Sequence, residues 1–187
     1  MIFNKAQLMT YRVVLIILFT VCASFHTNAQ TSQREYALKA GLMYYFALYS
    51  QNSDSVLTDI SHYVICSSSQ PFVEVAEKTL AHKKIRQRDV KVQYIQSLLP
   101  DSEPCHIIFF DNQQSYSQYQ ASHNNNPRNA MLIGDIPHFI DLGGHINFIR
   151  IGGKIRFEIA PEQLQAKGIK VSSKVIRLGK VKMRNNS

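Results

Sequence analysis

Motifs typical of enzymes and metal sites are missing from this sequence of 187 residues. It contains no Gly-x-Ser-x-Gly elbow, so nothing supports a serine hydrolase. No Cys-x-x-Cys or His-x-x-x-His spacing indicates a metal site. The histidines are scattered along the chain, and the carboxylates form no recognisable pair. The sequence therefore gives no evidence of catalysis, and we expect neither a metal nor another cofactor.

Apolar runs long enough to cross a membrane are also missing. The apolar run near the start, residues 13–25, is shorter than the ~20 residues that a membrane-spanning helix needs. Lys5 and Arg12 precede this run, and Thr27 and Ala29 supply the small residues of a signal-peptidase site. We therefore predict that residues 1–29 are a cleaved secretory signal rather than an anchor, and that the mature protein does not insert into a membrane.

Linkers and repeats are absent from the remaining chain, residues 30–187, which has the size of one domain. Acidic residues are few, since 13 Asp and Glu stand against 21 Lys and Arg in the whole chain. Because the protein is expected to be exported, nucleic acid is a poor explanation of the basic excess. The remaining explanations are binding to an acidic protein, binding to a membrane surface, or simple solvation of the chain. This excess is concentrated near the C-terminus, at Lys167, Lys170, Lys174, Arg177, Lys180, Lys182 and Arg184.

Cysteine is rare, and cleavage of the signal would leave only Cys66 and Cys105. In an oxidising compartment, an isolated pair of this kind favours a disulfide over a metal site. Each cysteine adjoins an apolar run typical of a strand, so the bond would join the end of one strand to the start of another. Closing a loop of ~40 residues would stabilise the fold by roughly 3–4 kcal/mol.

Strand and helix patterns alternate along the mature chain, which predicts an α/β fold with a mostly parallel sheet covered on both faces. The alternation ends at "HINFIRIGGKIRFEI", where two β-rich runs flank Gly152 and Gly153. A phosphate-binding glycine loop lies between a strand and a helix, so this position favours the turn of a β-hairpin. We expect other strands at 61–66, 89–95, 105–110 and 129–134, helices at 34–50, within 67–82, and at 112–122, 135–141 and 161–167, and a last short helix that uses Val171, Val175, Ile176 and Leu178.

Two short stretches are candidate binding sites. Ser67, Ser68 and Ser69 follow a predicted strand and precede a helix, where α/β sheets bind small ligands. An ordinary N-cap is the competing interpretation, because serine oxygens accept hydrogen bonds from the exposed amides of a helix. Arg156 and Glu158 share one face of the second hairpin strand, and they form either a recognition pair or a salt bridge worth only ~0–1 kcal/mol.

The C-terminal third of the chain resembles the signature of the YfiR-like family, the uncharacterised-domain family DUF4154. The residues that carry the resemblance are "GGHINFIRIGGKIRFEI", "APEQLQAKG" and "SSKVIRL". "EYALKAGLMYYFA" is similar to the N-terminal helix of the family and "CHIIF" to its central strand, and Cys66 and Cys105 fall where many members carry a cysteine pair. Two features depart from the pattern, since "LYSQNSDS" replaces a tryptophan-proline pair and Ala160 replaces an asparagine.

The resemblance implies a Rossmann-like three-layer α/β sandwich with a C-terminal hairpin and short terminal helices, a periplasmic location and no catalytic activity. It implies a regulator that binds and represses the periplasmic sensor domain of an inner-membrane diguanylate cyclase, which lowers cyclic-di-GMP and biofilm formation. Arg156, Glu158, Leu164 and Ile169 would form the partner-binding surface, and a homodimer stays open. The second hypothesis is a periplasmic sensor that binds a small anionic ligand at residues 67–69.

Overall fold

The computed structural model describes residues 26–52, 61–96, 104–122 and 129–183. The predicted signal peptide lies almost entirely outside these residues, so its cleavage stays a prediction. The chain divides into two compact units, Met1–Glu35 and Tyr36–Ser187. The first described helix, α2 (His26–Leu48), runs through this boundary, and the other described helices and strands belong to the second unit.

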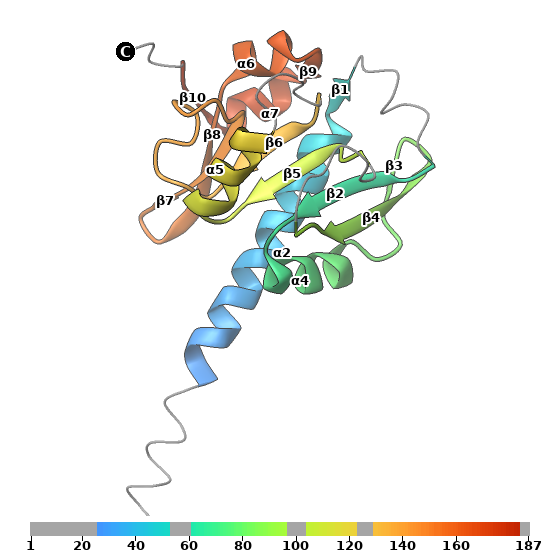
Figure 1. The fold of residues 1–187 in the computed structure, drawn as a ribbon, viewed down its shortest axis with the longest axis vertical. Helices are drawn as coiled ribbons and strands as arrows, with labels where there is room; N and C mark the ends of the chain where they lie inside the picture. Colours follow the sequence, from blue (N-terminus) through green and yellow to red (C-terminus); the bar gives the residue numbers. More distant parts are fainter. Residues whose placement is uncertain (1–25, 53–60, 97–103, 123–128, 184–187) are drawn as a thin grey trace, which may run out of the picture. The chain divides into compact units, whose positions relative to one another are not determined.

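The second unit is built on an eight-stranded sheet (Figure 1). Neighbouring strands from β4 through β2, β5 and β6 to β7 run parallel, and so do β8 and β10, whereas the β3–β4 and β7–β8 pairs are antiparallel. The predicted mostly parallel α/β sheet is therefore confirmed. From one edge to the other, its strands are β10 (Lys180–Val181), β8 (Lys154–Ile159), β7 (Ile146–Ile151), β6 (Met131–Gly134), β5 (Ile107–Phe110), β2 (Tyr63–Ser67), β4 (Arg88–Tyr94) and β3 (Lys84–Ile85).

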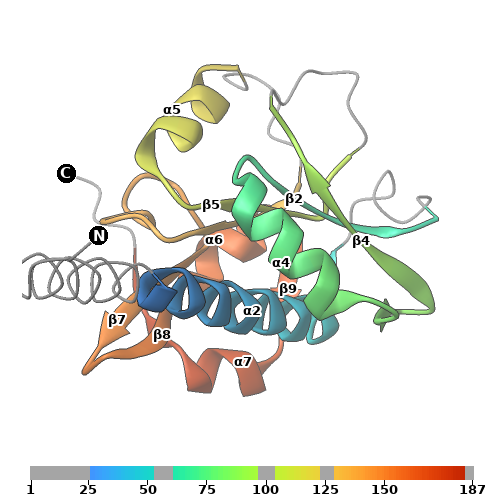
Figure 2. The same cartoon turned by 90° about the horizontal axis from the view of Figure 1, so that it is seen from below.

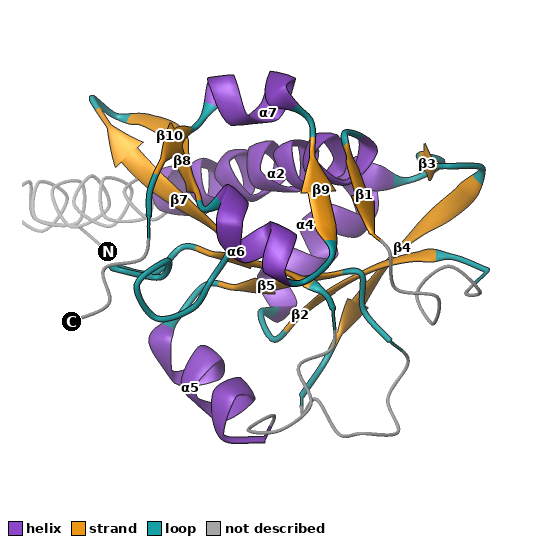
Figure 3. Ribbon diagram, turned by 90° about the horizontal axis from the view of Figure 1, so that it is seen from above, coloured by secondary structure: helices purple, strands orange, loops and turns teal. Residues whose placement is uncertain are grey.

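Helices cover both faces of this sheet, which confirms the predicted three layers (Figures 2 and 3). The C-terminal part of α2 and α4 (Gln70–Leu80) lie on one face, and α5 (Gln113–Ser122) lies on the other. Alternate residues of a strand point to opposite faces. Accordingly, Ile65 of β2 packs in the core under α2 and α4, whereas Val64 and Cys66 pack in the core under α5.

The hairpin of β7 and β8 forms as the sequence predicts. Ile151 pairs with Lys154, so Gly152 and Gly153 make a two-residue turn. Their φ angles of 56° and 73° lie in the left-handed region, where glycine carries no steric penalty. The double glycine therefore reverses the chain between two strands, and it does not open a helix as a phosphate-binding loop would.

The helix predicted at 135–141 is wrong, because this segment forms successive turns. His138 has a φ of 59°, which no α-helical residue adopts. The amide of Phe139 donates to Ile136 O at 3.2 Å, a bond that spans three residues rather than the four of an α-helix. The buried side chains of this segment, Ile136 and Phe139, pack in the same cluster as Tyr116 without forming a helix.

A small second sheet was not evident in the sequence. Val171, predicted for the last helix, belongs to β9 (Ile169–Val171), which pairs antiparallel with β1 (Ser50–Asn52), as Figure 3 also shows. Val175, Ile176 and Leu178 belong to a last short helix as predicted, α7 (Ser173–Leu178), and Leu178 at its end is 75% exposed. Strands of three residues are too short to show an alternating pattern.

Candidate functional site

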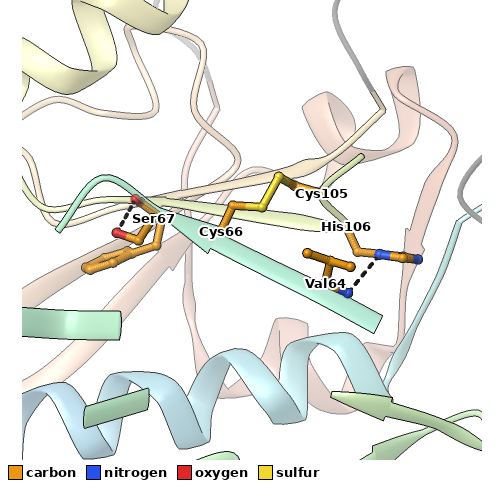
Figure 4. Close-up of a disulfide and its surroundings, with 6 residues drawn as sticks. Val64, Cys66, Ser67, Cys105 and His106 are labelled. Atoms are coloured by element: carbon orange, nitrogen blue, oxygen red, sulfur yellow. Dashed lines mark hydrogen bonds between the residues drawn. A yellow bond between two sulfur atoms is a disulfide. The ribbon is translucent and has the colours of Figure 1, made fainter. Parts of the chain in front are cut away.

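The predicted disulfide is present (Figure 4). Cys66, near the C-terminal end of β2, is bonded to Cys105, which lies just before β5, and the two Cα atoms are 5.9 Å apart. Beside the bond, the amide of Val64 donates to Nδ1 of His106 at 3.0 Å, and the amide of His106 donates to Val64 O at 2.8 Å. Both cysteines are fully buried, so the bond fixes the two adjacent strands from inside the core.

The three candidate serines after Cys66 have different surroundings. Ser67 Oγ donates to Phe109 O at 3.0 Å and accepts from Ser69 N at 3.2 Å, so it is used within the fold (Figure 4). Ser69 occupies the N-cap position of α4, but its side chain makes no capping hydrogen bond. Ser68 Oγ is buried and has no hydrogen-bond partner in the described part of the chain. Of the three, Ser68 is therefore the residue placed to meet a ligand.

Ser68 lines a cavity of about 320 Å³ at the carboxyl ends of the parallel strands. In the sheet, β2 lies between β4 and β5, and the chain passes from β2 to β4 on one side and later to β5 on the other side. We call the cavity the switch-point cavity because the strand order reverses here. Ligands of α/β sheets bind outside the strand ends at such a reversal of strand order. None of the lining residues that the structure describes is charged. The lining residues are Ser68, Ile95, Gln96, Phe110, Ser115, Gln118, Tyr119 and Ser122.

Arg156 and Glu158 lie on one face of β8. Arg156 is exposed and makes no ion pair with a described residue. The Glu158 side chain is only 14% exposed, and Lys180 Nζ of β10 lies 3.6 Å from its Oε1. Arg156 is therefore open to a partner, whereas Glu158 is partly covered. The hairpin face, as we define it, comprises the residues on this side of β7, β8 and β10, namely Ile149, Ile151, Lys154, Arg156, Glu158 and Lys180.

The other two predicted contact residues lie in the core, which corrects the sequence expectation. Leu164 of α6 (Pro161–Ala166) is 0% exposed, and Ile169 of β9 is 2% exposed. Both belong to the same cluster as Phe148 and Phe157 under the hairpin. A short amphipathic helix turns its largest apolar side chain inward, so neither residue can contact a partner while the protein is folded.

Sequence reasoning misses one buried charge. Lys39 of α2 is 1% exposed and forms an ion pair with Asp135, the residue that follows β6. Its Nζ also lies 5.9 Å from the centre of the Phe148 ring. The signal was in the sequence, because Lys39 precedes Met43 and Phe46 by four and seven residues and so falls on the apolar stripe of the helix. A lysine at such a position requires a buried acidic partner.

The buried histidines serve as backbone acceptors. Nδ1 of His145 accepts from the amide of Leu132 at 3.0 Å, in the same way that His106 accepts from Val64. Burial, with a smaller contribution from Lys167, lowers the pKa of His145 from 6.5 to about 3. The ring is therefore neutral near pH 7 and fixes the start of a neighbouring strand, a structural contact rather than a catalytic one.

The described residues form neither a metal site nor a membrane-spanning helix. No three His, Cys, Asp or Glu side chains in these segments lie close enough together to hold a metal ion. No helix within the same segments is long and apolar enough to cross a membrane. The switch-point cavity and the hairpin face are thus the two surface features to compare with known proteins.

Comparison with curated proteins gives no match. The sequence model of the YfiR/HmsC-like family (DUF4154) matches residues 36–180. The match begins at Tyr36, where the second compact unit begins, and it includes the disulfide, the switch-point cavity and the hairpin. Members of this family are periplasmic, non-catalytic regulators of diguanylate cyclases. Since the match covers most of the chain, this protein belongs to the YfiR/HmsC-like family.

Proposed function

We propose that this protein is an exported repressor that binds the periplasmic sensor domain of an inner-membrane diguanylate cyclase. Repression would lower cyclic-di-GMP and thereby biofilm formation. Membership of a family of periplasmic regulators of diguanylate cyclases supports this class of partner. The exposed hairpin face supports direct binding as the way in which the protein acts.

Apolar and basic side chains lie next to one another on the hairpin face. The cross-strand pairs Ile149–Arg156 and Ile151–Lys154 place each isoleucine beside a cation. Ile151 is 56% exposed, and Lys154 and Arg156 are exposed as well. Water-exposed isoleucine on a sheet face is typical of a surface that another protein covers.

The charge of this face indicates an acidic partner surface. Lys154, Arg156 and Lys180 supply three cations, against the one carboxylate of Glu158. Arg156 is the observation that carries the proposal, because it is exposed, has no acidic partner in the described chain, and lies beside apolar side chains. An arginine in such a position can form a two-pronged hydrogen bond with a carboxylate of the partner.

The hairpin is held rigidly from its other side. Phe157 of β8 packs against Phe46 of α2 with ring centres 4.8 Å apart, and Phe148 of β7 lies 6.3 Å from the same ring. Rigid surfaces lose little conformational entropy on binding, which favours affinity. The buried aromatic contacts therefore present the hairpin face in a fixed geometry.

Charge reversal at Arg156 tests the proposal. We expect Arg156→Glu to abolish capture of the periplasmic cyclase domain in a pull-down and to raise cellular cyclic-di-GMP to the level of a deletion strain. Lys78→Glu is the matched control, because Lys78 is an exposed cation on α4, outside the hairpin face. Repression that survives Arg156→Glu, with an unchanged melting temperature, would rule out the hairpin face as the docking surface.

A further inference from the structure

The switch-point cavity is not used by the proposed docking of the cyclase, and its walls have a chemistry of their own. We infer that it binds a small, neutral, polyhydroxylated molecule of the carbohydrate class. This inference goes beyond the repressor role, and it replaces the anionic ligand that the sequence suggested for residues 67–69.

The place of the cavity in the fold favours a ligand. Ser68 follows β2, Gln96 follows β4, and Phe110 ends β5. The carboxyl ends of three neighbouring parallel strands therefore lie at the rim of the cavity. Side chains at this edge of an α/β sheet are positioned by rigid strands while their tips remain open to solvent. The volume of about 320 Å³ lies at the lower end of the range for small-molecule sites.

The polar groups of the wall match hydroxyl groups rather than ions. Serine hydroxyls and glutamine amides can each donate and accept hydrogen bonds, as the hydroxyls of a sugar can. Carboxylates and phosphates only accept, and an ammonium group only donates, so each would leave half of these groups unmatched. A charged ligand would also lose hydration without gaining an opposite charge from the lining residues that the structure describes.

Three of these polar groups are available for a ligand. Ser68 Oγ is buried without a partner among the described residues, an arrangement that is costly unless something fills the site. The side chains of Gln96 and Gln118 line the cavity and make no hydrogen bond with any residue that the structure describes. Together they offer hydroxyl and amide groups from three places in the fold, namely the residues after β2, the residues after β4, and α5.

One wall is apolar and aromatic. Phe110 and Tyr119 line the cavity with ring centres 5.3 Å apart, and Ile95 completes this wall. Sugar rings have apolar C–H faces that pack on aromatic side chains, while their hydroxyls point to polar groups at the rim. A site with an aromatic wall and neutral hydrogen-bonding groups therefore fits an uncharged ring-shaped ligand.

Helix α5 lines the cavity with polar but uncharged side chains. Ser115, Gln118 and Ser122 are spaced by three and four residues, so they form one polar stripe along the side that lines the cavity. The helix contains no charged residue at all, which is unusual for a helix on a protein surface. It is anchored from behind, because Tyr116 Oη donates to Leu142 O at 2.9 Å.

Amide NMR spectra of the mature protein titrated with D-glucose, D-galactose and N-acetyl-D-glucosamine test this inference. We expect at least one sugar to shift the amide signals of Ser68, Ser115 and Gln118 in a saturable way. Gln118→Leu and Ser68→Ala should each weaken that binding about tenfold, since each removes a hydrogen bond to the ligand. Gln114→Leu is the matched control, because Gln114 is exposed on the same helix and does not line the cavity.

The melting temperature separates a ligand role of Ser68 from a structural one. A buried hydroxyl without a partner is costly to the free fold, so Ser68→Ala should leave the melting temperature of the ligand-free protein unchanged or raise it, while it weakens sugar binding. The inference is overturned if none of the three sugars shifts these signals, if binding survives Gln118→Leu, or if sodium phosphate binds there instead. Capture of the cyclase domain by Gln118→Leu should equal that of the wild type, so failure here is distinct from failure of the repressor proposal.

Discussion

The switch-point cavity and the hairpin face lie on the same sheet, yet their chemistry is opposite. The cavity is concave, and the lining residues that the structure describes are uncharged. The hairpin face is an open strand surface with three cations and an isoleucine that is 56% exposed. Concave neutral walls select a small hydrogen-bonding molecule, whereas an open basic and apolar surface suits an acidic protein.

This contrast follows from the strand pattern. β2 leads into α4 and β5 leads into α5, so the carboxyl ends of these parallel strands leave space that loops and α5 enclose. The antiparallel β7 and β8 are joined by a two-residue turn that encloses nothing. One sheet thus provides a pocket at its centre and a flat surface near its edge, and separate substitutions can test each.

The largest expected effect is at Leu164, which the hairpin covers. We expect Leu164→Ala to lower the free energy of unfolding by about 2–5 kcal/mol, because its side chain is fully buried. Arg156→Ala should change it by less than about 0.5 kcal/mol, since that side chain is exposed. Urea titrations followed by circular dichroism measure both values. Equal stabilities for the two variants would show that Leu164 is not core, and its predicted role as a contact residue would return.

Removal of the disulfide tests the part of the sheet formed by β2 and β5. We expect Cys66→Ser with Cys105→Ser to lower the free energy of unfolding by roughly 3 kcal/mol, because the bond closes a loop with a sequence separation of 39. Thiol labelling of the denatured, unreduced wild type should find no free cysteine in the mature chain. In hydrogen exchange, amides of β2 and β5 should lose protection before those of the hairpin. A uniform loss would contradict the separation of these two parts of the sheet.

The pH dependence of the free energy of unfolding tests the structural role of His145, whose Nδ1 accepts a hydrogen bond from the amide of Leu132. Its folded pKa of about 3 lies below its unfolded value of 6.5, so the unfolded chain takes up a proton first as the pH falls. This contribution to stability is complete above pH 6.5 and is lost progressively toward pH 3. Between pH 6.5 and 5 we expect a loss of about 2 kcal/mol from this ring. His145→Gln keeps an acceptor for Leu132 without the titration, so its unfolding curve should be flatter over that interval. An identical slope would exclude His145 as the cause.

Much of this fold was predictable because its signals are local. Alternating apolar residues identify the strands, Gly152 and Gly153 supply the positive φ that a tight turn requires, and two cysteines in an exported chain leave one pairing. The predictions that were wrong concern features that depend on tertiary contacts. Leu164 stands in a helix of six residues, and only the packing against the sheet decides which side of so short a helix is buried.

The switch-point cavity shows the same limit. The sequence pointed to residues 67–69, but the other lining residues come from the ends of β4 and β5 and from α5. Each segment alone looks like an ordinary polar connection, and only the fold shows that they meet around one cavity whose described lining residues carry no charge. The polar stripe of α5 and the lysine at position 39 were readable clues, because each breaks the usual pattern of its helix.

The smallest expected effect concerns Lys180, and it tests whether the hairpin face serves binding or stability. Its Nζ lies 3.6 Å from Glu158 Oε1, but the lysine side chain is 70% exposed, so solvent screens the pair. We expect Lys180→Met to change the free energy of unfolding by less than about 1 kcal/mol.

Loss of one cation from the face should still slow association with an acidic partner, most clearly at low salt. Surface plasmon resonance with the cyclase domain at two salt concentrations measures this rate, and Lys78→Met on α4 controls for net charge. An association rate equal to that of Lys78→Met would mean that Lys180 serves only to hold Glu158, and the docking surface would then shrink to Arg156 and its apolar neighbours.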